Sequence, residues 1–255
     1  ELGLIGLNDK IFCAGFYELG SRKFHCWLKG GHGKLTLQEG IQKSCDVYFY
    51  ELARKVGVKR IGDMARRLGL GQAYDLPLTG LSKGFVPTKK WKKERFGTSW
   101  LVGDTLNVGI GQGFSLATPL QLAVMTARLA SGKEVTPNII KNPNKNVGNP
   151  KTLSIKENTL VAIQKGMFNV LNEKEGTAYN FRTTDKNFLI AGKTGTSQVR
   201  RITREEREEG VIKNEDLPWK MRDHALFTCF APYENPRYAL SAVSYTHLTL
   251  PTMDS

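Results

Sequence analysis

IAGKTGTS, at residues 190–197, is the stretch of this sequence that decides the predicted fold. The residues around it, 188–191 and 196–199, have the apolar and β-branched composition of strand, with two glycines between them. The sequence therefore predicts that Lys193, Thr194 and Gly195 lie on a strand, among small and hydroxyl residues.

Two further strands are predicted on the C-terminal side of this segment. His224 to Ala231 is rich in aromatic and apolar residues, and Tyr238 to Val243 follows the turn at 234–236. Short or looped connections between consecutive strands indicate an antiparallel sheet. A helical block precedes these strands, and this order predicts an α+β fold rather than alternating α/β.

Four amphipathic helices are predicted ahead of the sheet. The first opens at a capping box, Thr36 to Glu39, and continues to Gly57. Its apolar residues recur at spacings of three and four, at Leu37, Ile41, Cys45, Tyr48, Phe49, Leu52 and Val56. The others are expected over 58–68, over 118–130, and from a second capping box at Ser154 to about Leu171.

The remaining segments have little periodicity. Residues 1–35 are predicted to form loops and short strands, and residues 72–116 a long irregular connection rich in Gly and Pro. Within that connection, five basic residues surround Trp91 and are expected in a solvated loop: Lys89, Lys90, Lys92, Lys93 and Arg95.

Composition sets limits on the class of protein. The chain has 255 residues, 40% of them hydrophobic, and a formal net charge of +13, which is the composition of a globular protein. No apolar run approaches the roughly 20 residues of a membrane-spanning helix. The basic residues are spread along the chain without a nucleic-acid-binding motif, so we predict no nucleic-acid partner. The chain begins with Glu1 rather than Met and has no signal peptide, so we expect a longer protein with its anchor further upstream.

Several catalytic motifs can be excluded. Gly192-Lys193-Thr194 ends like a phosphate-binding loop, but Asn187 stands where that loop needs its first glycine. The glycine-rich segment 109–113 is followed by Phe114 instead of the third glycine of a dinucleotide loop. What remains is Lys193-Thr194-Gly195 on a strand, with Ser44-Cys45-Asp46 earlier in the chain. Such a pair belongs to the acyl-transfer set of penicillin-binding proteins and serine β-lactamases.

With these two motifs in the expected order, the chain resembles the transpeptidase domain of the penicillin-binding protein 2 family, the class B enzymes of cell elongation. The resemblance covers residues 1–243 and is carried by Gly31-His32-Gly33, residues 44–50, 103–113 and 117–121, Gly176-Thr177-Ala178, residues 193–196, and Phe230-Ala231-Pro232. It implies an antiparallel sheet with helices on both sides, incomplete here. Residues 244–255 depart from the family pattern and are similar to a translated adapter, so we expect a non-native tail.

The resemblance implies a peptidoglycan D,D-transpeptidase that cross-links D-Ala-D-Ala stem peptides through a serine acyl-enzyme and binds β-lactams. Alternatives are a D,D-carboxypeptidase or β-lactamase-like hydrolase, or a non-catalytic β-lactam-sensing or scaffold domain with the same fold. The family's nucleophile lies in a Ser-x-x-Lys motif, which this sequence lacks. We expect that motif upstream of Glu1, and we expect the 255-residue chain alone not to acylate.

The resemblance also implies a role for each site residue. Lys193 and the hydroxyls of Thr194 and Thr196 would bind the substrate carboxylate. A strand edge at Gly195-Thr196 would let the N–H of Thr196 form half of the oxyanion hole, with the missing serine supplying the other half. Gly195 leaves room for the ligand, and Ser197 completes the substrate-binding set.

Two further catalytic residues are implied in the Ser44-Cys45-Asp46 motif. Ser44 would pass a proton to the leaving amine, and Asp46 stands where many relatives have Asn. From the residues alone, Ser44 and Asp46 could equally be surface polar residues in the middle of a helix, because the apolar period runs straight through them.

Cysteines suggest a second site. Cys13, Cys26, His32 and Cys45 could surround a structural zinc ion with three thiolates and one imidazole, and some members of the resembling family are thought to carry zinc just ahead of Ser44. Two alternatives remain open, a Cys13–Cys26 disulfide and small buried apolar residues. Cys229, within a predicted strand, is expected in the core.

The family resemblance also implies partners and a location. It implies elongation machinery that includes a polytopic glycosyltransferase, and a position on the periplasmic side of the inner membrane with a single-pass anchor outside this chain.

Overall fold

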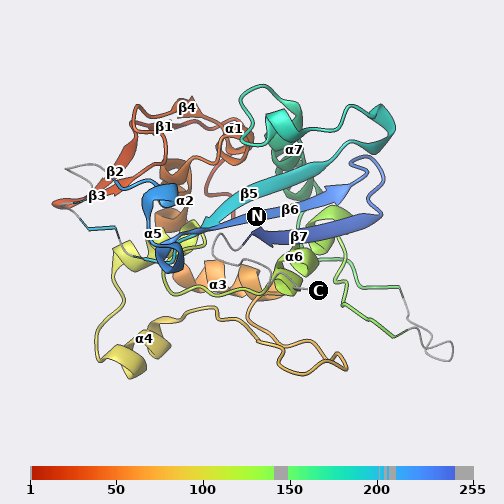
Figure 1. The fold of residues 1–255 in the computed structure, drawn as a ribbon, viewed down its shortest axis with the longest axis horizontal. Coiled ribbons are helices and arrows are strands. Elements are labelled where there is room, and N and C mark those ends of the chain that lie inside the picture. Colours follow the sequence, from red (N-terminus) through yellow and green to blue (C-terminus); the bar gives the residue numbers. More distant parts are fainter. Residues whose placement is uncertain (1, 141–148, 201, 204–205, 207–210, 245–255) are drawn as a thin grey trace, which may run out of the picture.

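The computed structural model describes residues 2–140, 149–200, 202–203, 206 and 211–244. Its central element is a three-stranded antiparallel sheet in the order β5-β6-β7 (Figure 1), made of β5 (Ala191–Ser197), β6 (His224–Ala231) and β7 (Tyr238–Ser244). Lys193 lies opposite Thr228 on β6, and β5 has no other partner strand among the described residues. The Lys-Thr-Gly segment is therefore on an edge strand, as predicted.

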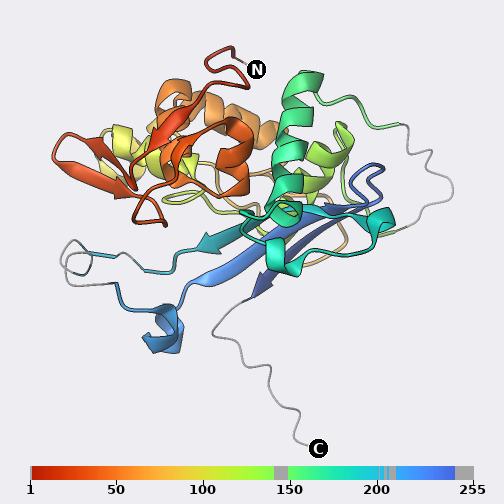
Figure 2. The same cartoon turned by 90° about the horizontal axis from the view of Figure 1, so that it is seen from above.

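Two long helices cover one face of this sheet (Figure 2), α6 (Pro119–Ser131) and α7 (Glu157–Asn172). Leu129, Met167, Val170 and Phe230 are buried between helices and sheet with α1 (Leu37–Gln42) packed alongside. The predicted α+β class and antiparallel sheet are confirmed. In the described part of the chain the packed helices lie on this one face, so the expected second helical side is not among those residues.

A second core lies in the N-terminal part. It is built by two two-stranded antiparallel sheets: β1 (Ile11–Cys13) pairs with β4 (Gly33–Leu35), and β2 (Phe16–Leu19) forms a hairpin with β3 (Arg22–His25). They pack on α2 (Asp46–Val56), whose Tyr48 is fully buried. The predicted loops and short strands over 1–35 are confirmed.

The helix predicted over 36–56 is wrong in one important respect. The capping box at Thr36 forms, but α1 ends at Gln42 and α2 begins at Asp46. Between them Ser44 adopts a left-handed conformation with φ +51°. Ile41 on α1 is buried in the core against the sheet, and Tyr48 on α2 is buried in the N-terminal core. Apolar residues therefore keep recurring at helical spacing through the break and hide it.

The irregular connection predicted over 72–116 contains two helices, α4 (Lys89–Phe96) and α5 (Val102–Gly109). The basic cluster is therefore helical, capped by the hydroxyl of Thr88 and ended by left-handed Gly97. Lys92 is buried with its Nζ 2.5 Å from Asp104 Oδ2, an ion pair that no local pattern predicts.

Other boundaries differ less. Helices α3 (Val58–Arg67) and α6 match their predictions, whereas α7 begins at Glu157 with Lys156 as its N-cap, so Ser154 does not cap it. Strand was predicted over 188–191 and 196–199, whereas one continuous strand runs from Ala191 to Ser197. Phe188 belongs to a 3-10 turn, and residues 198–199 lie beyond the strand. The 3-10 turns are η1 (Tyr179–Phe181), η2 (Lys186–Phe188), η3 (Asn214–Asp216) and η4 (Trp219–Met221). Apart from Ser244, which ends β7, the predicted tail lies outside the described residues.

No helix in the described residues is both long and apolar enough to cross a membrane.

The close crossing of α5 and α2 provides a stability prediction. A Cβ at Gly109 would lie 2.3 Å from the Cβ of buried Ala53, so Gly109→Ala should force the helices apart. We expect a loss of about 1–3 kcal/mol in the free energy of unfolding, as for overpacked cores. Denaturant titration measures it, with Gly30→Ala as the control because a Cβ there meets nothing within 4 Å. Equal stability of the two variants would contradict the packing described.

Candidate functional site

The side chain of Lys193 connects the sheet to the break between α1 and α2. Its Nζ donates to Ser44 Oγ at 2.7 Å and to its neighbour's carbonyl, Thr194 O, at 2.8 Å. The two predicted catalytic residues, 149 positions apart in the chain, are thus in direct contact. The interpretation of Ser44 as mid-helix surface polarity is wrong, because Ser44 lies in a turn and not in a helix.

The residues on either side of Ser44 are tied to separate parts of the chain. The ammonium of Lys43 pairs with Glu175 at 2.9 Å, and the backbone carbonyl of Lys43 accepts a hydrogen bond from the indole N–H of Trp27 at 3.0 Å. Asp46 Oδ2 accepts from the backbone N–H of Trp27 at 2.9 Å. These contacts offset the cost of a left-handed residue other than glycine, of order 1–3 kcal/mol. The serine is held in place before any ligand arrives.

Burial shifts the two ionisable groups beside Ser44. Desolvation lowers the pKa of Lys193 to about 8, with the charge of Asp46 acting in the opposite direction. Desolvation also raises the pKa of Asp46 to about 6. At neutral pH Lys193 therefore keeps a positive charge at the edge of the sheet, where it can bind an anion.

The free edge of β5 carries the other predicted binding residues. Thr194 shares a hydrogen bond with the hydroxyl of Thr177 at 2.7 Å, and the carbonyl of Thr196 accepts from Gln112 Nε2 at 2.6 Å. Gly195 and Thr196 are exposed, and Ser197 ends the strand opposite His224. The edge therefore presents hydroxyl and backbone groups beside one ammonium, a set suited to an extended peptide with a carboxylate.

Sequence reasoning gave no role to three residues of this site: Trp27, Gln112 and Thr177. Gln112 and Thr177 belong to the stretches that carry the family resemblance, but neither residue type by itself indicates chemistry. The glycines at 111 and 113 were the available signal, since both have positive φ and so fix the loop that presents Gln112.

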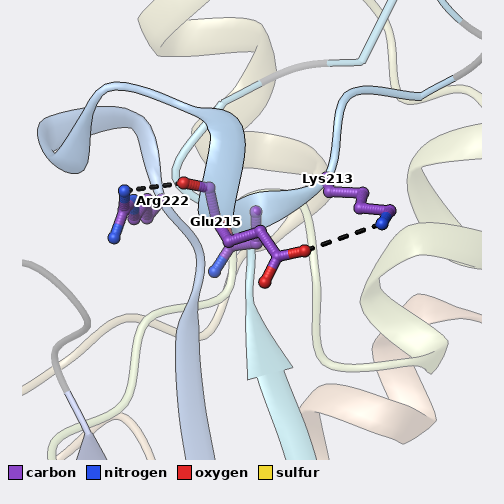
Figure 3. A pocket seen from close by; sticks show the side chains of 4 residues that line it. Lys213, Glu215 and Arg222 are labelled. Carbon is purple, nitrogen blue, oxygen red and sulfur yellow. Dashed lines mark hydrogen bonds and ion pairs between the residues drawn. The ribbon is translucent and has the colours of Figure 1, made fainter.

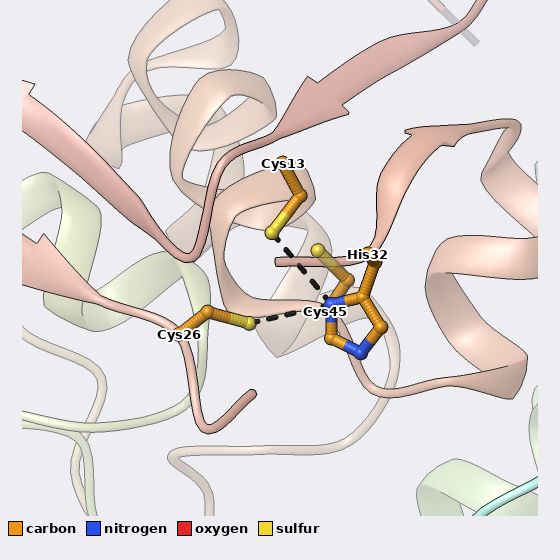
Figure 4. Close-up of side chains that lie close together, drawn as sticks. All are labelled: Cys13, Cys26, His32 and Cys45. Carbon is orange, nitrogen blue, oxygen red and sulfur yellow. Dashed lines mark hydrogen bonds between the residues drawn. The ribbon is translucent and has the colours of Figure 1, made fainter. Parts of the chain in front are cut away.

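The four predicted metal ligands converge (Figure 4). Cys13, Cys26, His32 and Cys45 place one ligand atom each within 4.8 Å of one another, and Nδ1 of His32 lies 3.6 Å from Sγ of both Cys13 and Cys26. Tetrahedral zinc, with Zn–S about 2.3 Å and Zn–N about 2.05 Å, separates its sulfur and nitrogen ligands by about 3.6 Å. The donor set therefore fits this ion in both chemistry and spacing.

The state of the thiols bears on the alternatives. All four cysteines are free, so the structure has no Cys13–Cys26 disulfide, and Cys229 lies in β6, apart from the cluster. A hydrogen bond from Cys45 lowers the pKa of the Cys26 thiol, which favours a thiolate in the cluster. Nε2 of His32, the other ring nitrogen, is buried with no hydrogen-bond partner in the described part of the chain.

One hollow in the described part of the chain lies away from this strand edge (Figure 3). It measures about 440 Å³ and is lined by Lys213, Asn214, Glu215 and Arg222, ahead of β6. Lys213 and Glu215 are 3.7 Å apart and well exposed, so their charges are screened by solvent. None of the predicted site residues lines it.

Comparisons with known proteins show the family of this chain. Residues 1–247 match the family model described as the penicillin binding protein transpeptidase domain. The peptidoglycan D,D-transpeptidase MrdA of Haemophilus influenzae is 34% identical over 252 residues, which is 92% of this chain and 37% of that protein. The chain thus spans little more than a third of that relative.

Solved structures give the same result. The penicillin-binding protein 2 of Helicobacter pylori, in complex with MreC, superimposes with a TM-score of 0.81 at 37% identity, covering 94% of this chain and 42% of that one. The Pseudomonas aeruginosa protein in complex with WCK 5153 superimposes with a TM-score of 0.80 at 33% identity, covering 94% and 50%.

Proposed function

The chain belongs to the penicillin-binding protein transpeptidase family, and from that premise we propose that it forms most of the peptide-binding site of a peptidoglycan D,D-transpeptidase. The observation that carries the proposal is the 2.7 Å contact between Lys193 Nζ and Ser44 Oγ at an open strand edge. It brings together a cation for the substrate carboxylate and a hydroxyl that can relay a proton.

The substrate in this proposal is a stem peptide ending in D-Ala-D-Ala. Its terminal carboxylate binds the ammonium of Lys193 and the hydroxyls of Thr194 and Thr196. The carbonyl of the penultimate residue then lies over the backbone N–H of Thr196, which stabilises the negative charge that develops on its oxygen. A β-lactam presents a carboxylate and a reactive carbonyl in a similar arrangement and competes for this site.

The nucleophile in this proposal is a serine in a Ser-x-x-Lys motif N-terminal to Glu1. Its hydroxyl attacks the carbonyl carbon, the peptide C–N bond breaks, and the departing D-Ala amine takes a proton through Ser44. The amine of a neighbouring stem peptide then attacks the ester, forms the cross-link and releases the serine. If water attacked instead, the reaction would be that of a carboxypeptidase.

Covalent labelling tests this proposal. The whole protein, incubated with a fluorescent penicillin and denatured, should carry one label per chain, whereas residues 1–255 alone should carry none. An unlabelled whole protein would overturn the proposal and favour a non-catalytic domain. Labelling of the short chain would place the nucleophile within it.

The pH dependence of labelling should follow Lys193. This residue is charged below its lowered pKa of about 8 and neutral above it, so carboxylate binding is lost as the pH rises. We expect the second-order rate constant of acylation to fall about tenfold per unit above pH 8. Rapid-quench measurement between pH 6 and 10 gives the profile, with an ester of the same penicillin as the control. A plateau through pH 9.5 would contradict it.

We also propose that Cys13, Cys26, His32 and Cys45 hold a structural zinc ion. The support is the convergence of the four ligand atoms and the 3.6 Å sulfur–nitrogen spacings. Bound there, zinc would cross-link the end of β1, the segment after β3 and the N-terminus of α2. Cys45 immediately follows Ser44 and Trp27 follows Cys26, so the cluster would also stabilise the catalytic turn.

We propose that the whole protein acts with cell-wall machinery on the periplasmic side of the inner membrane, anchored by a segment outside this chain. The penicillin-binding protein 2 of Helicobacter pylori, solved in complex with MreC, supports a partner of this kind. A glycosyltransferase partner is part of the same proposal and is tested by co-purification.

A further inference from the structure

Gln112 reaches across from the loop after α5 to the free edge of β5. Its Nε2 donates to the carbonyl of Thr196 at 2.6 Å. Two glycines with φ near +75° flank it, and its backbone N–H is bonded to Asn107 O at 2.9 Å. The loop backbone is therefore fixed, while the half-buried side chain can rotate about its own bonds.

The position of this contact on the strand matters. A strand residue directs its N–H and its C=O to the same side. Since Thr196 O faces Gln112, the N–H of Thr196 also faces the open edge. Thr194 O points to that edge as well and already accepts from Lys193 Nζ. Thr196 therefore presents its backbone N–H and C=O to a ligand, and Gln112 already occupies the C=O.

Antiparallel pairing explains how a ligand would use the carbonyl of Thr196. In a hydrogen-bonded antiparallel pair, two opposite residues exchange both bonds, N–H to C=O in each direction. A ligand residue whose carbonyl accepts from Thr196 N–H will therefore direct its own N–H at Thr196 O. In the proposed reaction, that residue carries the carbonyl under attack. Its N–H and the amide of Gln112 compete for one acceptor.

We propose that Gln112 is a specificity-determining residue that occupies the carbonyl of Thr196 in the free enzyme and gives way only to a ligand with a correctly placed N–H. This inference rests on the proposed function. A ligand with that N–H replaces one hydrogen bond with another, whereas a ligand without it leaves Gln112 in place. Gln112 therefore imposes the loss of its own hydrogen bond on acyl groups that are amides of a preceding residue, as in a peptide, and imposes no such loss on acyl groups without that N–H.

Two β-lactam probes separate the cases. Benzylpenicillin has an acylamino N–H on the carbon next to its reactive carbonyl, and a carbapenem has a hydroxyethyl group there. Gln112→Ala removes the competing donor, so acylation of the whole protein by benzylpenicillin should become about 2- to 10-fold faster, the weight of one net hydrogen bond. Acylation by the carbapenem should stay within about twofold, so the ratio of the two rate constants rises.

Two variants make the measurement secure. Gln112→Met keeps the length of the side chain without its donor and should raise the ratio in the same way, even if Gln112→Ala is unstable. Gln38→Ala, on α1 away from the edge, should leave the ratio unchanged. Equal changes with both probes, or slower acylation by benzylpenicillin alone, would overturn this inference and leave the proposed function standing. A wild-type protein that neither probe acylates would overturn both.

Discussion

Replacing Lys193 with methionine should slow acylation of the whole protein by benzylpenicillin about 10²- to 10³-fold. Methionine keeps the length of the side chain but removes the charge that binds the carboxylate and the hydrogen bond to Ser44. Losses of this size are usual when one fixed electrostatic contact to a reacting group is removed. The second-order rate constant of acylation measures the effect.

The fold should not suffer from this substitution. Burial lowers the pKa of Lys193, so holding its charge costs free energy, and a neutral side chain of similar volume removes that cost. We expect the melting temperature to stay equal or rise slightly. Lys59→Met, at a side chain that is 86% exposed, is the matched control and should change neither quantity. If Lys193→Met were acylated at the wild-type rate, this lysine would be ruled out as the carboxylate-binding group.

Local patterns predicted the elements whose cause is local. The strand β6 was predicted with the bounds observed, because its apolar run is bounded by turns on both sides. Helix α6 was predicted from the capping threonine and proline at 118–119, and both perform those functions. In each case the residues that define the element are within a few positions of one another.

Features created by distant contacts escaped prediction. The left-handed Ser44 depends on Trp27 and on Lys193, which lie 17 and 149 positions away. Helix α4 looked like a solvated loop because buried Lys92 finds its partner at Asp104, on another helix. No periodicity reports such pairs, so the sequence alone left Ser44 between a catalytic and a surface role.

The candidate sites also depend on distant contacts that the sequence alone does not show. Spacing alone could not relate Ser44 to Lys193, and only the resemblance to a known family placed them together. The four metal-ligand candidates were chosen by residue type, while their convergence depends on how two small antiparallel sheets pack on α2. Gln112 was missed because its role depends on the edge it faces and not on its own chemistry.

Removing one metal ligand should have the largest effect on stability. We expect the whole protein to be purified with one zinc ion per chain and Cys26→Ala with none. Structural zinc contributes about 10–16 kcal/mol in small peptides. Even part of that contribution should lower the melting temperature of Cys26→Ala by about 10 °C or more. Metal analysis and thermal unfolding measure the two effects.

Cys229→Ala is the control for this comparison, because Cys229 is a free, half-buried thiol outside the cluster. It should keep its zinc and most of its stability, so that loss of a buried sulfur is separated from loss of a ligand. Acylation should slow in Cys26→Ala as well, since Trp27 and Cys45 then lose the anchor beside Ser44. Two results would contradict the zinc proposal: a metal-free wild type whose Cys13 and Cys26 are oxidised together, or equal stability of the two variants. Either would mean that burial or a disulfide stabilises this corner of the molecule.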